Sequence, residues 1–201
     1  MAGVIRRAGE PSEPVTVVAA LRVEALAIGG RTVRCGMGPV RAAACGTDLA
    51  RHLPADQPVA VLGVAGGLDP VLPAGAVVVA SEVGRVGELA IALPHARALA
   101  QVLDRAGVEV HLRPIVSTGR IARGAWRRQL ASGGAAAVDM ESASLVRALP
   151  GRPLVVVRAL ADTPTTGMLR GGVRGLLALR HLRPAVTTWA AALEGGGHEA
   201  G

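Results

Sequence analysis

The sequence of 201 residues contains no Phe, Tyr, Lys or Asn, and its only Phe/Tyr/Trp-type aromatics are Trp126 and Trp189. Two indoles are too few for the stacking platforms with which many proteins hold single-stranded nucleic acid, so that class is excluded. All 22 basic residues are Arg, whereas Ala, Gly, Pro and Val are plentiful, a pattern that we interpret as genomic base bias. Half of the residues are apolar, which is enough for the core of one domain.

The sequence also has few cysteines and no histidines at the spacing of metal ligands. Cys35 and Cys45 cannot cross-link a chain of this size, so we expect them to be free thiols in a reducing compartment. The five His residues have no ligand spacing, so the sequence predicts neither a metal site nor a cofactor. No uninterrupted apolar run reaches 18 residues and residues 1–14 lack a signal-peptide core, so we predict a cytoplasmic protein.

The net charge of +7 leaves several interpretations open. The Arg residues are spread along the chain and interrupted by acids, which disfavours a nucleic-acid partner. The simplest interpretation is solvated helix faces, and an anionic ligand or membrane surface is the alternative. The two densest groups are Arg120, Arg123, Arg127 and Arg128, and then Arg170, Arg174, Arg180 and Arg183.

Strand-like and helix-like segments alternate along the chain. Apolar, β-prone runs predict strands over residues 15–21, 31–35, 59–64, 76–80, 108–116, 135–138 and 154–160. Helical spacing bounded by Pro or Gly predicts helices over residues 39–53, 94–106, 125–130, 140–149 and 184–194. Because most strands are apolar on both faces, we predict an α/β fold: a three-layer α/β/α sandwich with a central mixed sheet. We expect a flexible leader over 1–14, one domain over 15–194 and a flexible tail over 195–201.

In such folds ligands bind beyond the carboxyl ends of strands, which directs attention to the residues after Leu21, Gly36–Gly38, Ala65–Gly67, Asp139–Glu141 and Arg158–Asp162. Five groups of residues in or beside these places could carry chemistry. Each also has a local structural interpretation: a helix-dipole Glu, a Gly-Gly turn, an N-cap Asp with a first-turn Glu, a strand Arg and a turn Asp. The Arg is the most demanding, because a strand-interior guanidinium needs a partner or a ligand. The residues are Glu24, Gly66-Gly67, Asp139-Met140-Glu141, Arg158 and Asp162.

Taken in order, these segments resemble the nucleoside phosphorylase and nucleosidase superfamily. The resemblance is strongest to the methylthioadenosine/S-adenosylhomocysteine nucleosidases, and the hopanoid-biosynthesis-associated phosphorylase-like proteins also fit. It covers most of residues 15–165. The matching segments are Ala20-Leu21-Arg22-Val23-Glu24, Gly36-Met37-Gly38-Pro39-Val40, Val64-Ala65-Gly66-Gly67-Leu68-Asp69-Pro70, Ala74-Gly75-Ala76-Val77-Val78-Val79, Val138-Asp139-Met140-Glu141-Ser142-Ala143 and Val155-Val156-Val157-Arg158-Ala159-Leu160-Ala161-Asp162.

The resemblance implies a role for each residue in breaking an N-glycosidic bond through an oxocarbenium-like sugar. It implies that Asp162 protonates N7 of a purine, that Glu24 activates water and that Arg158 positions the nucleophile. It implies that Met140 and Glu141 bind the ribose, the Glu141 carboxylate accepting hydrogen bonds from its hydroxyl groups. Gly66, Gly67, Val138 and Ile121 would surround the rest of the substrate.

The chain departs from the family pattern at the nucleophile and at the mouth of the site. Residues 61–64 lack the Arg and Ser with which phosphorylases hold phosphate, which favours water as the nucleophile. Val64 and Ala161 each replace a Ser of the nucleosidases, Ile121 replaces a purine-stacking Phe, and residues 84–100 lack the aromatics that enclose a small 5′ group.

Three functions follow, and the first is the one the departures favour. It is a purine nucleosidase that releases adenine from an adenosine-type nucleoside with a bulky or apolar 5′ group, adenosylhopane being one such substrate. The second is phosphorolysis on the same scaffold, with phosphate held by Arg34, by Arg41 or by a neighbouring subunit. The third is a non-catalytic ligand-binding or membrane-surface scaffold. A lipid-linked substrate implies peripheral membrane contact, and the resemblance implies a homo-oligomer.

Overall fold

The structure is a computed structural model that describes residues 13–163 and 168–196. Its helices are α1 (Arg22–Ile28), α2 (Pro39–His52), α3 (Ala96–Arg105), α4 (Gly124–Ala131), α5 (Ser142–Ala148), α6 (Met168–Leu179) and α7 (Leu182–Gly196). Its strands are β1 (Thr16–Ala19), β2 (Thr32–Arg34), β3 (Val59–Gly67), β4 (Val77–Arg85), β5 (Ile91–Ala92), β6 (Val110–Ser117), β7 (Ala137–Asp139) and β8 (Leu154–Asp162).

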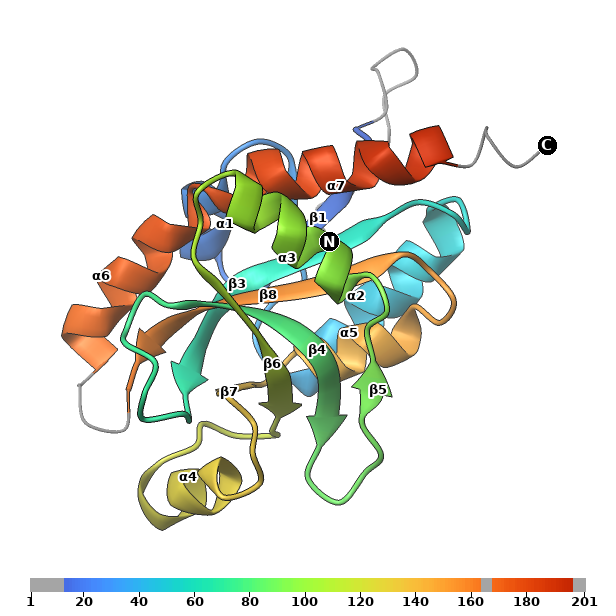
Figure 1. Ribbon diagram of the computed structural model, residues 1–201. Coiled ribbons are helices and arrows are strands. Elements are labelled where there is room, and N and C mark those ends of the chain that lie inside the picture. The colour runs from blue at the N-terminus through green and yellow to red at the C-terminus, as the bar shows by residue number, and fades with distance from the viewer. Residues whose placement is uncertain (1–12, 164–167, 197–201) are drawn as a thin grey trace.

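The strands form one mixed sheet that closes on itself (Figure 1). Strand β1 pairs in parallel with β2 and β3, and β3 pairs in parallel with β8. Strand β8 continues antiparallel to β4, β4 pairs in parallel with β6, and β6 pairs in parallel with β7. Because β7 returns antiparallel to β3, the strands β3, β8, β4, β6 and β7 complete a ring.

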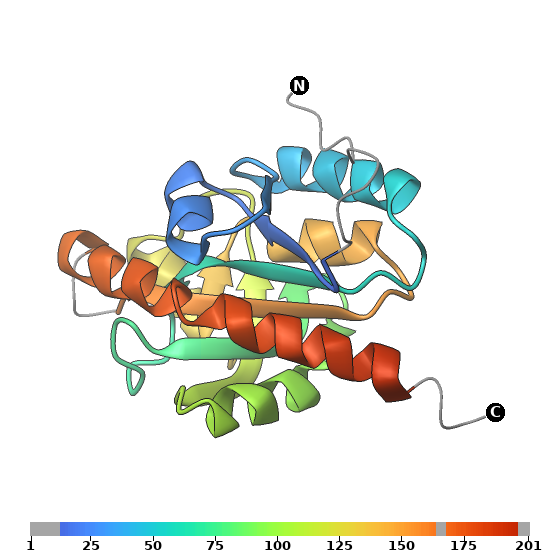
Figure 2. The same cartoon turned by 90° about the horizontal axis from the view of Figure 1, so that it is seen from above.

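Helices cover both sides of this sheet (Figure 2). The α2 and α5 helices lie together on one side and α3 lies on the other, where it packs against α7. The main core gathers apolar side chains from β1, β3, β4 and β8 and from these helices. The predicted α/β fold with a central mixed sheet is therefore confirmed, and the ring closure refines it.

The most apolar segments form β3 and β8, which pair with each other in the ring. All nine positions of β8 are buried, Arg158 and Asp162 included, and seven of the nine positions of β3 are buried. Such runs, apolar on both faces, are typical of strands with a helix layer on each side. Helix α2 begins at Pro39, directly after Gly38 at φ 97°, and ends before Pro54, as its sequence predicts.

Three described elements, α1, α6 and β5, were not among the predicted helices and strands. Helix α1 lies where the sequence suggested only a first-turn position for Glu24. Tertiary packing, not local propensity, holds α6 and β5. Helix α6 was not predicted, since it contains Gly171, Gly172 and Gly175, which are poor helix formers. A Cβ at Gly175 would lie 3.3 Å from the carbonyl oxygen of Leu160, so this glycine lets α6 pack closely on β8. The short strand β5 forms only by pairing with β4.

The predicted leader and tail fall largely outside the described residues. Glu13, the first described residue, pairs with Arg183 at 2.7 Å, and its carbonyl oxygen accepts a hydrogen bond from Gln57. Helix α7 extends to Gly196, two residues into the predicted tail. The domain boundaries at 14 and 194 remain a prediction.

The central position of β3 yields a stability prediction. Leu62 is fully buried, so Leu62→Ala removes packing that the core cannot replace and lowers the free energy of unfolding by about 2–5 kcal/mol. Leu89 is 92% exposed, and we expect Leu89→Ala to change it by less than about 0.5 kcal/mol. Urea unfolding of both variants makes the comparison, and similar values for the two would contradict the assigned core.

Candidate active site

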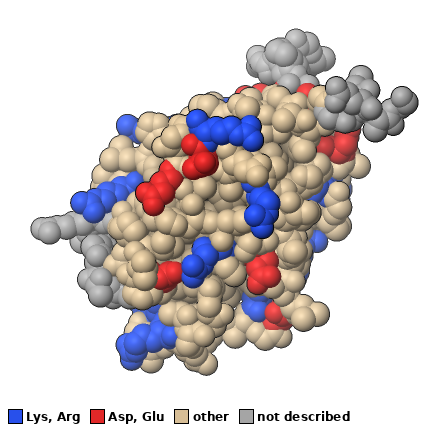
Figure 3. All heavy atoms as spheres, in the orientation of Figure 1, with Lys and Arg blue, Asp and Glu red and all other residues tan. Residues whose placement is uncertain are grey.

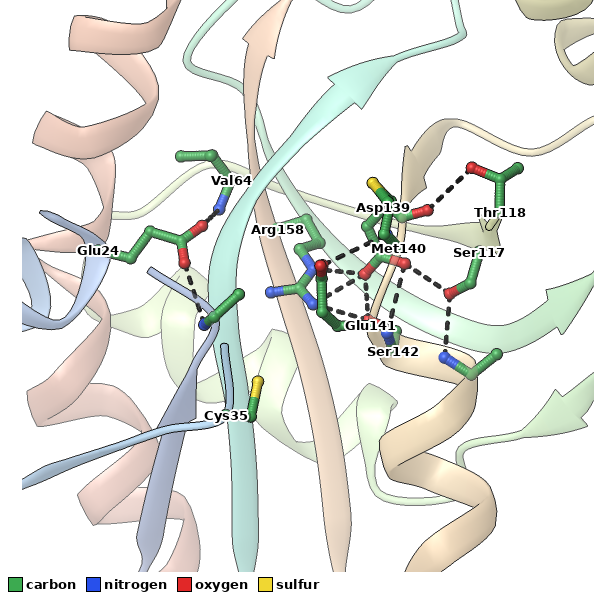
Figure 4. A network of polar contacts seen from close by, with 12 residues as sticks. Glu24, Cys35, Val64, Ser117, Thr118, Asp139, Met140, Glu141, Ser142 and Arg158 are labelled. Atoms are coloured by element: carbon green, nitrogen blue, oxygen red, sulfur yellow. Dashed lines mark hydrogen bonds and ion pairs between the residues drawn. The ribbon is translucent and has the colours of Figure 1, made fainter. Parts of the chain in front are cut away.

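A buried ion pair between Arg158 and Asp139 lies at the centre of the candidate site (Figure 4). Arg158 comes from the middle of β8 and Asp139 from the end of β7, and both side chains are 1% exposed. The Arg158 Nε donates to Asp139 Oδ2 at 2.8 Å. This pair supplies the partner that a strand-interior Arg requires, and sequence reasoning did not assign it.

Two serines complete the hydrogen bonds of this pair. Ser117, the last residue of β6, donates to Asp139 Oδ1 at 2.5 Å and accepts the backbone N–H of Ala143 at 2.9 Å. Ser142, the first residue of α5, donates to Asp139 Oδ2 and accepts from Arg158 Nη2 at 2.9 Å. Asp139 thus fixes both the guanidinium and the start of α5, which is more than the predicted N-cap role.

Glu24 enters the site from the first turn of α1 and is 2% exposed. Its Oε2 accepts the backbone N–H groups of Leu21 at 2.7 Å and Ala20 at 3.1 Å. Its Oε1 accepts the N–H of Val64, in β3, at 2.8 Å. The bonds to Leu21 and Ala20 support the interpretation of Glu24 as a residue that stabilises the start of a helix. The bond to Val64 places Oε1 beside Gly63 of β3, on the side where Arg158 lies.

Glu141 and Met140 follow β7 directly. Glu141 Oε1 accepts the N–H of Gly38 at 2.7 Å, which joins this carboxylate to the start of α2. Its Oε2 lies 3.3 Å from the backbone N of Met140. Burial raises the pKa of Glu141, and Arg158 and the Gly38 N–H oppose that rise.

Glycine 63 lets the charged groups approach one another. A Cβ on Gly63 would lie 2.4 Å from Arg158 Nη1 and 2.8 Å from Glu24 Oε1, so no larger residue fits between them. Burial alone would lower the pKa of Arg158, but Asp139, Glu24 and Glu141 together raise it. Three carboxylates therefore surround one guanidinium, and the predicted residues Glu24, Glu141 and Arg158 share one neighbourhood.

Asp162 lies at the end of β8, four residues and about 13 Å beyond Arg158 at the usual strand rise. Its Oδ1 accepts the N–H of Gly67 at 3.2 Å, and it pairs in register with Gly66. Arg127 of α4 binds both carboxylate oxygens, from Nη1 to Oδ2 at 2.8 Å and from Nη2 to Oδ1 at 2.6 Å. Arg127 also donates to the carbonyl oxygen of Gly67 through Nη2 at 2.5 Å and Nε at 3.2 Å.

The remaining predicted residues, Val138 and Ile121, differ in burial. Val138 is buried, pairs with Gly66 and packs with Leu68, Ala122 and Leu130 in a small second core. Ile121 is 50% exposed, on the loop before α4, whereas its neighbour Ala122 is buried. The structure thus brings Gly66, Gly67, Val138 and Asp162 together and leaves Ile121 half outside.

Arg127 is the largest surprise of the site. Its group of arginines predicted solvated helix faces, but the Arg127 side chain is only 17% exposed and is paired with Asp162. Nothing in its neighbours Trp126 and Arg128 separates it from a surface Arg. Asp139 had a usable signal, because a buried strand Arg requires a carboxylate and Asp139 was available at another strand end.

Other sequence predictions concern groups outside these two clusters. Cys35 and Cys45 are free thiols, as predicted, and burial raises their pKa values to about 12 and about 11. Over residues 13–163 and 168–196, no three His, Cys, Asp or Glu side chains are arranged to hold a metal ion. Within the same ranges, no helix is both long and apolar enough to span a bilayer.

The buried pair yields a stability prediction. Asp139→Asn leaves the Arg158 charge without its nearest counter-ion, so we expect a loss of about 3–5 kcal/mol in the free energy of unfolding. Asp48→Asn is the control, because Asp48 pairs with Arg51 at 3.6 Å where both side chains are 69% exposed. Chemical denaturation should show less than about 1 kcal/mol for this exposed pair. Equal losses would refute the central role of Asp139.

Comparison with solved structures supports the same fold. A methylthioadenosine/S-adenosylhomocysteine nucleosidase of Campylobacter jejuni is 13% identical, with a TM-score of 0.77 over 89% of this chain and 98% of that one. The corresponding enzyme of Helicobacter pylori is 15% identical, with a TM-score of 0.74 over 89% and 97%. Futalosine hydrolase of Helicobacter pylori is 17% identical, with a TM-score of 0.70 over 90% and 97%.

No curated protein sequence matches the chain. The family model described as the phosphorylase superfamily matches residues 29–169, which is most of the chain and contains β3, β7, β8 and every predicted site residue except Glu24. The resemblance inferred from the sequence is therefore confirmed, and this chain belongs to the phosphorylase superfamily.

Proposed function

We propose that this protein is a purine nucleosidase that hydrolyses the N-glycosidic bond of an adenosine-type nucleoside and releases adenine. Membership of the superfamily makes it an enzyme that acts on nucleosides, and the solved structures it resembles are nucleosidases and a futalosine hydrolase. The choice of water, of adenine and of the 5′ group is our proposal.

The observation that carries the proposal is the surplus of carboxyl groups over guanidinium groups around Arg158. Glu24, Asp139 and Glu141 contribute three carboxylates against one guanidinium. The backbone N–H groups of Val64 and Gly38, which an anion would otherwise use, already donate to Glu24 and Glu141. A phosphate dianion would be repelled here, whereas water and a sugar that develops positive charge would be stabilised.

In the proposed reaction each carboxylate has a separate task. Glu24 Oε1 accepts one hydrogen bond, from Val64, and keeps a lone pair with which to orient and deprotonate water. Arg158 lies beside Glu24 across Gly63 and holds its carboxylate in place. Glu141 and Met140 hold the ribose hydroxyl groups. Asp162, at the carboxyl end of β8, takes up a proton from solvent once Arg127 releases it and donates that proton to N7 of the leaving purine.

We propose that the 5′ group is bulky or apolar, as in adenosylhopane. The absence of Phe and Tyr leaves mainly aliphatic side chains to contact a 5′ group at the entrance. Helix α6 exposes Val173 (59%) and Leu177 (47%) one turn apart, with Arg174 beside them, which suits contact with an anionic lipid surface.

The proposal also covers partners. We propose that α6 contacts a membrane surface, that the chain binds a second copy of itself, and that it does not bind nucleic acid. On the face drawn in Figure 3, basic and acidic side chains of the described residues are interspersed, which does not resemble the continuous basic stripe of a nucleic-acid site. Analytical ultracentrifugation that gives a monomer would remove the homo-oligomer from the proposal.

Removal of the leaving-group acid should abolish turnover without abolishing binding. We expect Asp162→Asn to lower kcat by about 10²–10⁴-fold, because a carboxamide cannot transfer the proton to N7. Adenine release from 5′-substituted adenosines, measured in the presence and absence of phosphate, makes the test. Rates in the parent protein should not depend on phosphate. Unchanged turnover in Asp162→Asn would reject the acid, and strict phosphate dependence would reject hydrolysis.

The exposed apolar pair on α6 should determine the preference for a lipid-like 5′ group. We expect the double variant Val173→Ser/Leu177→Ser to keep its kcat/KM for methylthioadenosine and to lose about tenfold or more for a long-chain 5′-alkyl adenosine on anionic vesicles. A matched change at Val71, which is 82% exposed, should leave both values unchanged. Equal losses on both substrates would contradict the assignment of this surface.

A further inference from the structure

Arg127 makes hydrogen bonds to the Asp162 carboxylate, which the proposed reaction assigns to the purine base. Its guanidinium makes hydrogen bonds to both oxygens of Asp162 and to the carbonyl oxygen of Gly67, at 2.5–3.2 Å. A carboxylate held in this bidentate way cannot carry and donate a proton toward a purine until the guanidinium leaves. Base and Arg127 therefore compete for Asp162.

We propose that Arg127 is a positioning residue that latches α4 over Asp162 in the free protein and is displaced by the nucleobase. This inference rests on the proposed function and adds to it a residue that neither the family match nor the structural comparisons assign. The latch holds the Asp162 carboxylate in a fixed orientation, and base binding exchanges its contacts with Arg127 for contacts with the purine edge.

The packing of α4 suits a helix that moves. Its eight residues bury only Leu130 fully, in a small core separate from the main one, and Figure 1 shows it at the lower edge of the molecule. The helix begins at Gly124, at φ 52°, and the chain turns again at Gly134, at φ 81°. Glycines at both ends permit a rotation of the helix that other residues would resist.

Two further observations concern the freedom of α4 to move. The indole N–H of Trp126 is buried and has no hydrogen-bond partner among the described residues, as is also true of Trp189, so no indole hydrogen bond holds α4 in place. A cavity of about 320 Å³ adjoins Arg127 and offers its side chain a place to move. The cavity is lined by Leu68, Ala122, Arg123, Gly124, Arg127, Arg128 and Ala131.

Calorimetric titration with adenine tests the latch directly. We expect Arg127→Met to bind adenine about tenfold or more tightly than the parent protein, because the base no longer displaces a bidentate charged contact. Arg127→Lys keeps the positive charge but cannot make two parallel hydrogen bonds to the carboxylate. Its affinity for adenine should therefore lie between those of the parent protein and Arg127→Met. Gln129→Met is the matched control, since Gln129 is exposed on the same helix and does not line the cavity, and it should bind as the parent does.

Unchanged or weaker adenine binding by Arg127→Met would overturn the latch, weaker binding showing instead that Arg127 contacts the base. Amide hydrogen exchange supplies a readout that does not depend on the ligand. Arg127→Met should accelerate exchange across α4 and Gln129→Met should not, and equal exchange in both would also overturn the latch. If adenine binds neither the parent protein nor any variant, the proposed function fails. Accelerated exchange in Arg127→Met alone would still establish that Arg127 latches α4 over Asp162.

Discussion

The ion pair between Arg158 and Asp139 is the constraint on which the rest of the site depends. It joins β8 to β7 inside a ring of strands, where neither charge can be hydrated. Because an unpaired buried charge is so costly, the position of Asp139 determines where Arg158 points, and the two serines leave Asp139 no alternative. Glu24 and Glu141 then approach the same guanidinium from α1 and from the β7–α5 junction.

The two ends of the site differ in what balances each carboxylate. Around Arg158 the carboxylates outnumber the cation, which suits a sugar that becomes positive in the transition state. At Asp162 one carboxylate meets one guanidinium, and the pair is neutral until a ligand separates it. Strand β8 carries Arg158 and Asp162 at a fixed spacing, so under the proposed function a single buried strand would set the distance between the group assigned to the sugar and the group assigned to the base.

Much of this arrangement could be predicted from the sequence, and the exceptions have physical reasons. The buried runs of β3 and β8 and the prolines around α2 predicted their elements, because burial on both faces and a fixed φ leave local traces. Helix α6 left none, since only the folded chain shows that Gly175 packs against β8. Arg127 left none either, because its partner lies 35 residues away and only the folded chain brings them together.

The central claim is that water, not phosphate, attacks the sugar. Mass spectrometry of the sugar product formed in ¹⁸O-labelled water, with phosphate present in excess, tests it most directly. The surplus of carboxylates around Arg158 predicts one ¹⁸O atom at the anomeric hydroxyl group and no sugar phosphate. A sugar 1-phosphate that carries no label would contradict the account.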